Sequence, residues 1–232
     1  MKEHPILLNG EMVKAVLDGR KTMTRRVIKT QPYGFLNNWK SDNTPCVFVS
    51  TNNEPDKRIC PYGQPGDRLW VREAWKTDIE YDPCSPSQID SGASLYFLAD
   101  ECASRINRHK GCGPIRWGKT RPSIHMPRWA SRITLEVVSV RVERVQEITE
   151  DDAMAEGIER YCSQEGKHYN PTPYYKAFPE KDGGLYSAKA AFEVLWDSIN
   201  AERGFGWDVN PWVWVIEFKR LTATRRERGE GK

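Results

Sequence analysis

The stretch SRITLEVVSVRVERV, residues 131–145, is the strongest strand signal in the chain. Its apolar residues alternate along one face and then continue one residue out of phase: first Ile133, Leu135 and Val137, then Val138, Val140 and Val142. Strict alternation is typical of a half-buried strand, and a shift of one residue within it indicates a β-bulge. A long strand that bends at a bulge is typical of a small barrel.

The flanking sequence predicts further strands over residues 6–8, 68–75, 94–98 and 212–218. It also predicts three short helices with recognisable caps or faces: Asn9 and Gly19 bound the first, Thr149 and Gly157 bound the second, and Phe192, Leu195, Trp196 and Ile199 form the apolar stripe of the third. The strands and helices do not alternate regularly, which excludes a doubly wound parallel sheet. The expected fold class is therefore α+β, a small and mostly antiparallel β-barrel decorated with short helices.

The chain of 232 residues fits one domain with long loops. We expect a single domain over residues 1–221, with irregular insertions near 31–62, 78–120 and 160–185, where proline, glycine and polar residues gather. Residues 222–232 are highly charged and are expected to form a disordered tail.

Composition narrows the functional classes. The net charge is only +3, from 35 basic and 32 acidic residues, so any nucleic-acid site must come from local clustering. No apolar run is long enough to span a bilayer and no apolar signal region opens the chain, so we expect a cytoplasmic protein without a membrane partner. The oligomeric state is not readable from the sequence.

The six cysteines form no CxxC pair, which favours free thiols in a cytosolic protein. We therefore expect no metal and no cofactor. A zinc site built from Cys84, Cys102, Cys112 and His109 is the alternative, although its spacing matches no usual ligand pattern.

The segment GRKTMTRR, residues 19–26, carries the densest group of polar chemistry. Its cations are Arg20, Lys21, Arg25 and Arg26, and its hydroxyls are Thr22 and Thr24. Such a group can contact phosphate or carboxylate oxygens at several points. The alternative is a solvated basic loop.

The longer segment DGRKTMTRR, residues 18–26, resembles the signature loop of the ASCH domain family, which belongs to the PUA-like β-barrel class. Later blocks follow in a similar order, with a Gly-Asp turn at 66–67, Ala-Glu-Gly at 155–157 and Ile-Glu-Phe-Lys at 216–219. The resemblance covers most of residues 5–219 and is closest to the larger ASCH proteins of phages and prophages.

The resemblance implies binding of RNA or of a modified nucleoside. Some small bacterial members are amidohydrolases that remove the acyl group from N4-acetylcytidine with a Lys, a Thr and a Glu, which match Lys21, Thr24 and Glu156 here. This chemistry is reasonable on its own terms, because a threonine hydroxyl needs a base and a lysine with a lowered pKa can supply one. Glu156 lies at the end of its helix, where the helix dipole disfavours a carboxylate, so its presence suggests a role.

Two further groups are candidates for contacting bases and phosphates. Trp70 and Arg72 share one face of the strand expected over 68–75, and Glu73 and Trp75 share the other. The alternative is a pair of core tryptophans beside an ion pair. His125 and Arg128 form a second basic cluster, in which His125 is a candidate general acid or a structural histidine.

Three functions remain open: a binding module for RNA or a nucleoside, an amidohydrolase, and a ribonuclease that uses Lys21, His125 and nearby arginines. The ribonuclease has the least support, because no acidic cluster has metal-ligand spacing.

Overall fold

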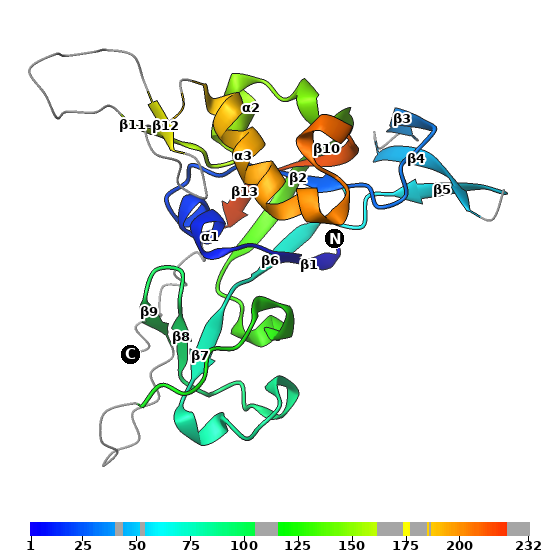
Figure 1. The fold of residues 1–232 in the computed structure, drawn as a ribbon. Coiled ribbons are helices and arrows are strands. Elements are labelled where there is room, and N and C mark those ends of the chain that lie inside the picture. The colour runs from blue at the N-terminus through cyan, green and yellow to red at the C-terminus, as the bar shows by residue number, and fades with distance from the viewer. Residues whose placement is uncertain are drawn as a thin grey trace, which may run out of the picture.

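The computed structural model describes residues 1–39, 44–51, 54–104, 116–161, 174–176, 185 and 187–221. It is an α+β structure around a five-stranded sheet in the order β1-β6-β10-β13-β2 (Figure 1). In that order the strands are Glu3–Leu7, Arg68–Arg72, Thr134–Arg144, Trp212–Leu221 and Met23–Val27. Strands β1 and β6 pair in parallel and the other neighbours are antiparallel, so the sheet is mostly antiparallel, as the sequence predicts.

The predicted bulge in β10 is confirmed. Val137 pairs with Phe218 and Ser139 pairs with Glu217, so Val138 is the extra residue between them. Val138 is 50 % exposed, whereas Val140 is buried. Val138 therefore does not share the buried face of Val140 and Val142, because the unpaired residue of a bulge leaves the alternation of its strand.

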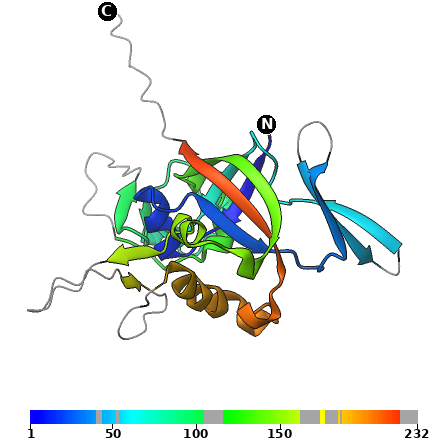
Figure 2. The ribbon, with the colours of Figure 1, turned by 90° about the horizontal axis from the view of Figure 1, so that it is seen from above.

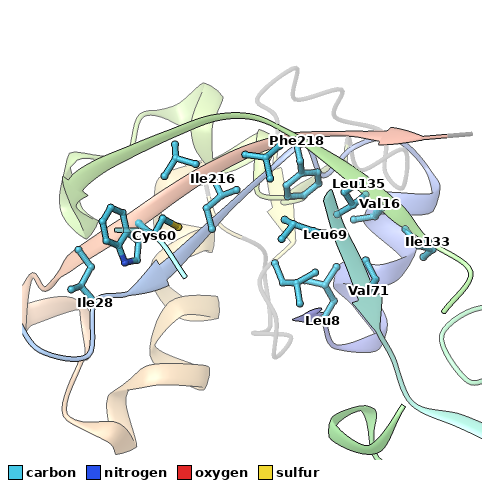
Figure 3. Close-up of a cluster of buried hydrophobic side chains, with 14 of the residues drawn as sticks. Leu8, Val16, Ile28, Cys60, Leu69, Val71, Ile133, Leu135, Ile216 and Phe218 are labelled. Carbon is cyan, nitrogen blue, oxygen red and sulfur yellow. The ribbon is translucent and has the colours of Figure 1, made fainter. Parts of the chain in front are cut away.

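The bent β10 arches over a core of apolar side chains from all parts of the sheet and from α1 (Figure 3). Leu69, Leu135 and Ile216 from neighbouring strands are fully buried there. Helix α1 (Gly10–Leu17) adds Val16, since its apolar residues recur at helical spacing. The Asn9 side chain accepts a hydrogen bond from the third residue of the helix, as predicted.

Helices α2 (Glu150–Ala155) and α3 (Ala188–Asn200) form a second apolar cluster against β2 and β13. Thr149 caps α2 and Gly157 follows its end in the left-handed conformation, with φ +100°, which confirms both predicted boundaries. Figures 1 and 2 both show α3 beside β2 on one side of the sheet. This pairing of β2 with α3 positions the site described below.

Three smaller sheets and seven 3₁₀ turns complete the described structure. The sheets consist of β3 (Gly34–Trp39), β4 (Thr44–Thr51) and β5 (Glu54–Ile59); β7 (Trp75–Thr77), β8 (Leu95–Phe97) and β9 (Cys102–Ser104); and β11 (Glu159–Tyr161) with β12 (Tyr174–Lys176). The 3₁₀ turns are Ile79–Tyr81, Pro86–Gln88, Ser123–His125, Arg128–Ala130, Val145–Glu147, Ala201–Arg203 and Trp207–Val209.

Two predictions about these regions were wrong. The segment near 31–62 is not irregular, because β3, β4 and β5 form a meander there and Val47 and Val49 are fully buried in the main core. The single strand expected over 68–75 breaks after Arg72, where the buried Glu73 turns toward an arginine instead of continuing the ladder.

Several predictions lie outside the described residues: the tail 222–232, most of the insertion at 160–185, and Cys112, Cys162 and His109. Within the described residues, no group of three or more His, Cys, Asp or Glu side chains is placed to hold a metal ion. The described helices include none that is long and apolar enough to cross a membrane.

Candidate functional site

The basic segment at residues 19–26 is not a solvated loop. Its second half is strand β2, and its first half covers the end of α2, where carbonyl groups lack helical partners. Three donors bind three successive carbonyl oxygens: Arg20 Nη1 to Gly157 O at 2.9 Å, Lys21 Nζ to Glu156 O at 2.8 Å, and the Thr22 amide to Ala155 O at 2.8 Å. The segment therefore joins α2 to the sheet.

Lys21 and Glu156 form an ion pair inside the protein. Lys21 Nζ lies 2.6 Å from Glu156 Oε2, and the two side chains are 0 % and 3 % exposed. Burial lowers the pKa of the Lys21 amine below its usual value, and the charge and hydrogen bond of Glu156 offset this lowering only in part. The second carboxylate oxygen, Glu156 Oε1, is also buried but accepts no hydrogen bond.

Gly157 allows Lys21 to approach α2 and α1 this closely. A Cβ atom on Gly157 would lie 2.9 Å from the Ala15 Cβ and 3.2 Å from the Lys21 Cβ. Its positive φ also favours glycine. The Ala-Glu-Gly sequence at 155–157 thus supplies both the buried carboxylate and the space for its lysine.

Arg25 is surrounded by carboxylates. Its Nη2 lies 2.5 Å from Asp152 Oδ2 and 3.3 Å from Glu143 Oε2, and its Nη1 lies 3.5 Å from Glu156 Oε1. Arg141 pairs with Asp152 and Glu143 from the other side. Arg25 thus contacts carboxylate oxygens of the protein itself, so its fully buried charge is already balanced and is not free for a phosphate.

Arg26 points to the other edge of the sheet. Its Nη2 donates to the Leu7 carbonyl oxygen at 2.6 Å, and its guanidinium lies 5.9 Å from the centre of the Tyr62 ring. No described carboxylate forms an ion pair with Arg26. The Arg26 guanidinium therefore remains available to bind an anion.

A cavity of about 170 Å³ opens between β2 and α3. Its buried polar lining consists of Thr24, Arg25, Glu156 and Asn200. Its walls are mostly apolar and aromatic, from Met12, Val27, Tyr62, Phe192, Leu195, Trp196, Ile199 and Phe205. A polar floor within aromatic walls is typical of a site for a small planar ligand.

Thr24 and Glu156 both line this cavity, whereas Lys21 lies behind Glu156 and does not. The Thr24 side chain is buried, and its hydroxyl has no hydrogen-bond partner among the described residues. Lys21 donates to Glu156, and no hydrogen bond joins it to Thr24 in the described structure. The three predicted catalytic residues are thus neighbours, with Glu156 rather than Lys21 facing the cavity beside Thr24.

The other predicted binding residues lie elsewhere and do not line the cavity. Trp70 is only 7 % exposed, and the guanidinium groups of Arg72 and Arg128 lie 4.6 and 5.9 Å from the centre of its ring. Arg128 also forms two hydrogen bonds with Glu3. This cluster holds the turn around His125 and Arg128 against β6, and the buried Trp70 offers little surface to a base.

None of the remaining candidates lines the cavity: Glu73, Trp75 and His125 lie in other parts of the structure. Glu73 is buried in a two-bonded pair with Arg132, and burial raises its pKa although Arg132 opposes the rise. Trp75 is fully buried in the core of the β7-β8-β9 sheet, which agrees with the alternative of a core tryptophan, and its ring is not open to a base. His125 is exposed and does not line the cavity with Thr24 and Glu156, so the structure does not assemble the expected ribonuclease residues.

Sequence reasoning missed most of the cavity wall. Phe192 and Trp196 were recognised only as the apolar stripe of a helix, and Tyr62, Lys29 and Arg203 were not singled out. The available signal was the pair of aromatic side chains in that stripe, because aromatic side chains often line the walls of ligand sites.

No protein-family model, curated protein or solved structure matches this chain.

Proposed function

We propose that this protein binds a nucleoside, with the base inserted in the cavity between β2 and α3. One observation carries the proposal: Glu156 Oε1 is a buried acceptor that makes no hydrogen bond, although Arg25 Nη1 lies 3.5 Å away, and Glu156 lines a cavity with aromatic walls. A buried acceptor that makes no hydrogen bond is costly, because the hydrogen bonds it makes with water in the unfolded chain have not been replaced. A ligand with an N–H group would satisfy it.

The volume of the cavity favours a base with one ring. An apolar cavity of about 150 Å³ holds a benzene molecule, and the volume here is about 170 Å³. Phe192 and Trp196 supply aromatic surface against which a planar ring can pack. Pyrimidines fit this space better than the two-ring purines.

The charge on Glu156 favours cytidine over uridine. Cytosine carries an amino group at C4, which donates hydrogen bonds, whereas uracil carries a carbonyl oxygen there, which a carboxylate repels. A hydrogen bond to a charged group contributes about 1.5–3 kcal/mol, so cytidine should bind more tightly than uridine by about tenfold or more.

Calorimetric titration of cytidine and uridine into the wild type and Glu156→Gln tests this. In the variant, the side-chain amide keeps an oxygen for Lys21 and turns an N–H toward the cavity, so the preference should reverse in favour of uridine. Glu136→Gln is the matched control, because Glu136 lies on β10 in a half-exposed pair with Lys219, outside the cavity. Equal affinities of the wild type for both nucleosides would contradict the proposal.

The curved sheet also bears on the fold and family of this protein. We infer an ASCH-type, PUA-like barrel, which the curved sheet supports: the edge strands β1 and β2 are joined by the hydrogen bond from Arg26 to Leu7 O. The buried Lys21–Glu156 pair and the free Thr24 hydroxyl also lie at the motif positions that the resemblance singles out.

A second function, hydrolysis of an N4-acylated cytidine, has one specific observation in its favour. The Thr24 hydroxyl faces the same cavity as Glu156 and is not engaged by any described residue. Such a reaction would convert N4-acetylcytidine and water into cytidine and acetate. The Thr24 oxygen would attack the acyl carbon while Glu156 takes its proton and passes it to N4 as the C–N bond breaks and cytidine leaves, and water would then hydrolyse the threonine ester to release acetate. Chromatography of N4-acetylcytidine after incubation with wild type and Thr24→Val tests this, since valine keeps the shape and removes the nucleophile.

A further inference from the structure

One side of the cavity carries three cations that the proposed binding of a base does not use: Arg26, Lys29 and Arg203. Lys29 and Arg203 are exposed and Arg26 is half buried, whereas Thr24 and Glu156 are buried. The cations therefore lie at the mouth of the cavity, and the hydrogen-bonding groups for a base lie at its floor.

The two sets of cations differ in their pairing. Lys21 lies behind Glu156 and Arg25 lies at the floor, and both form ion pairs with the buried Glu156. Arg26, Lys29 and Arg203 form no ion pair with any carboxylate in the described part of the chain. Positive charges clustered beside a cavity without a neighbouring carboxylate create a positive potential that attracts an anion.

Electrostatics at Arg26 agree with this geometry. Burial lowers the pKa of the Arg26 guanidinium, the Tyr62 hydroxyl and Glu156 oppose the lowering, and the nearby charge of Arg203 adds to it. Arg203, although it lies beyond α3 in the sequence, is thus close enough to repel Arg26. An anion between them would relieve this repulsion.

We propose that the mouth formed by Arg26, Lys29 and Arg203 binds the phosphate of a nucleotide whose base occupies the cavity, so that the ligand is a phosphorylated nucleoside. This rests on the proposed function. Arginine and lysine are the usual partners of phosphate oxygens, and two of the three lie on flexible, exposed side chains that can close over the group. The cavity walls are apolar, so the phosphate must remain at the mouth.

The test compares cytidine with cytidine 5′-monophosphate by calorimetric titration at low ionic strength. The wild type should bind the monophosphate more tightly by about tenfold, because exposed charge pairs each contribute about twofold to fivefold. In Lys29→Ala/Arg203→Ala the ratio of the two affinities should fall toward one. The matched control is Arg58→Ala/Lys219→Ala, which removes the same residue types and the same charge from exposed positions outside the cavity.

The outcomes separate this inference from the proposed function. Cytidine bound without any preference for the monophosphate would overturn the phosphate site and leave the base site standing. A preference that survives in Lys29→Ala/Arg203→Ala, or that is lost equally in the control pair, would also overturn it. Failure of both ligands to bind would refute both proposals.

A third ligand identifies the source of the phosphate. A single-stranded RNA pentanucleotide with one central cytidine carries the same group on a polymer. Binding tighter than that of cytidine 5′-monophosphate, lost in the double variant, indicates RNA, whereas weaker binding indicates the free nucleotide.

Discussion

Lys21→Met removes the buried cation that both neutralises the Glu156 carboxylate and binds the Glu156 carbonyl oxygen just after α2. Removing one partner of a buried pair costs about 3–5 kcal/mol, because the other charge stays buried. Arg25 lies 3.5 Å from Glu156 Oε1 and compensates in part, so we expect the lower end, about 3 kcal/mol. For a chain of this size, a loss of about 3 kcal/mol corresponds to a Tm lower by about 6–12 °C.

Urea denaturation followed by tryptophan fluorescence, with calorimetry for Tm, measures this cost. Lys14→Met is the matched control, since Lys14 pairs with Glu11 on the exposed side of α1 with about half of each side chain in solvent. Exposed pairs contribute less than about 1 kcal/mol. Lys21→Met/Glu156→Met should recover most of the loss, because replacing both partners by apolar side chains is close to neutral.

An equal cost for Lys21→Met and Lys14→Met would refute the reasoning, because it would mean that Lys21 is solvated in the folded protein. No recovery in the double variant would show that the two residues do not act as a pair.

Three other predictions concern the backbone at Gly157, the contact of Glu150 with α3, and two residues outside the cavity. Gly157→Ala should cost about 2 kcal/mol more than Gly66→Ala in urea denaturation, because both have positive φ but only Gly157 would place its Cβ against other atoms. Glu150→Gln should lower stability by about 1 kcal/mol near neutral pH. Burial raises the pKa of Glu150, but hydrogen bonds from the first residues of α3 lower it more. Arg72→Ala and His125→Ala should each leave cytidine affinity unchanged in calorimetric titration, because neither side chain lines the cavity.

The lowered pKa of Glu150 decides how the stability difference between wild type and Glu150→Gln changes with pH. A carboxyl group whose pKa is lowered by folding contributes stability that is present above its ordinary pKa and lost as the pH falls through the folded value. The difference between wild type and Glu150→Gln, measured by urea denaturation at a series of pH values, should therefore shrink in acid. A difference in the free energy of unfolding that is constant with pH would contradict a role for the Glu150 charge. A difference that grows in acid would mean that folding raises the pKa of Glu150 instead of lowering it.

The glycine prediction and the affinity prediction can each be contradicted by a single result. Equal losses in the two glycine variants would remove the argument that Gly157 makes room for Lys21. Loss of cytidine affinity in Arg72→Ala would move the binding site to the Trp70 side of β6.

Local rules explain which parts of the fold were predictable. The bulge at Val138 and the caps at Asn9 and Thr149 depend on neighbours within a few residues, so alternation and capping patterns reveal them. The meander β3-β4-β5 was missed because proline and asparagine suggest loops, although Val47 and Val49 enter the main core. That outcome depends on tertiary packing, which overrides local preference.

Only part of the candidate site was predictable, and the roles of its cations were not. Lys21, Thr24 and Glu156 come together, yet the cations of residues 19–26 are divided between helix capping, buried ion pairs and the cavity mouth. The division depends on Asp152 and Glu143, which are far away in the sequence and cannot be assigned to Arg25 from composition. Arg203 was missed for the same reason, because only the fold brings it beside Arg26.

A crystal structure of the protein with cytidine tests the central claim most directly. The account predicts the base between β2 and α3, with its N4 amino group at a hydrogen-bond distance of about 2.7–3.2 Å from Glu156 Oε1. Cytidine bound beside Trp70 and Arg72, or bound between β2 and α3 with its sugar toward Glu156, would contradict it.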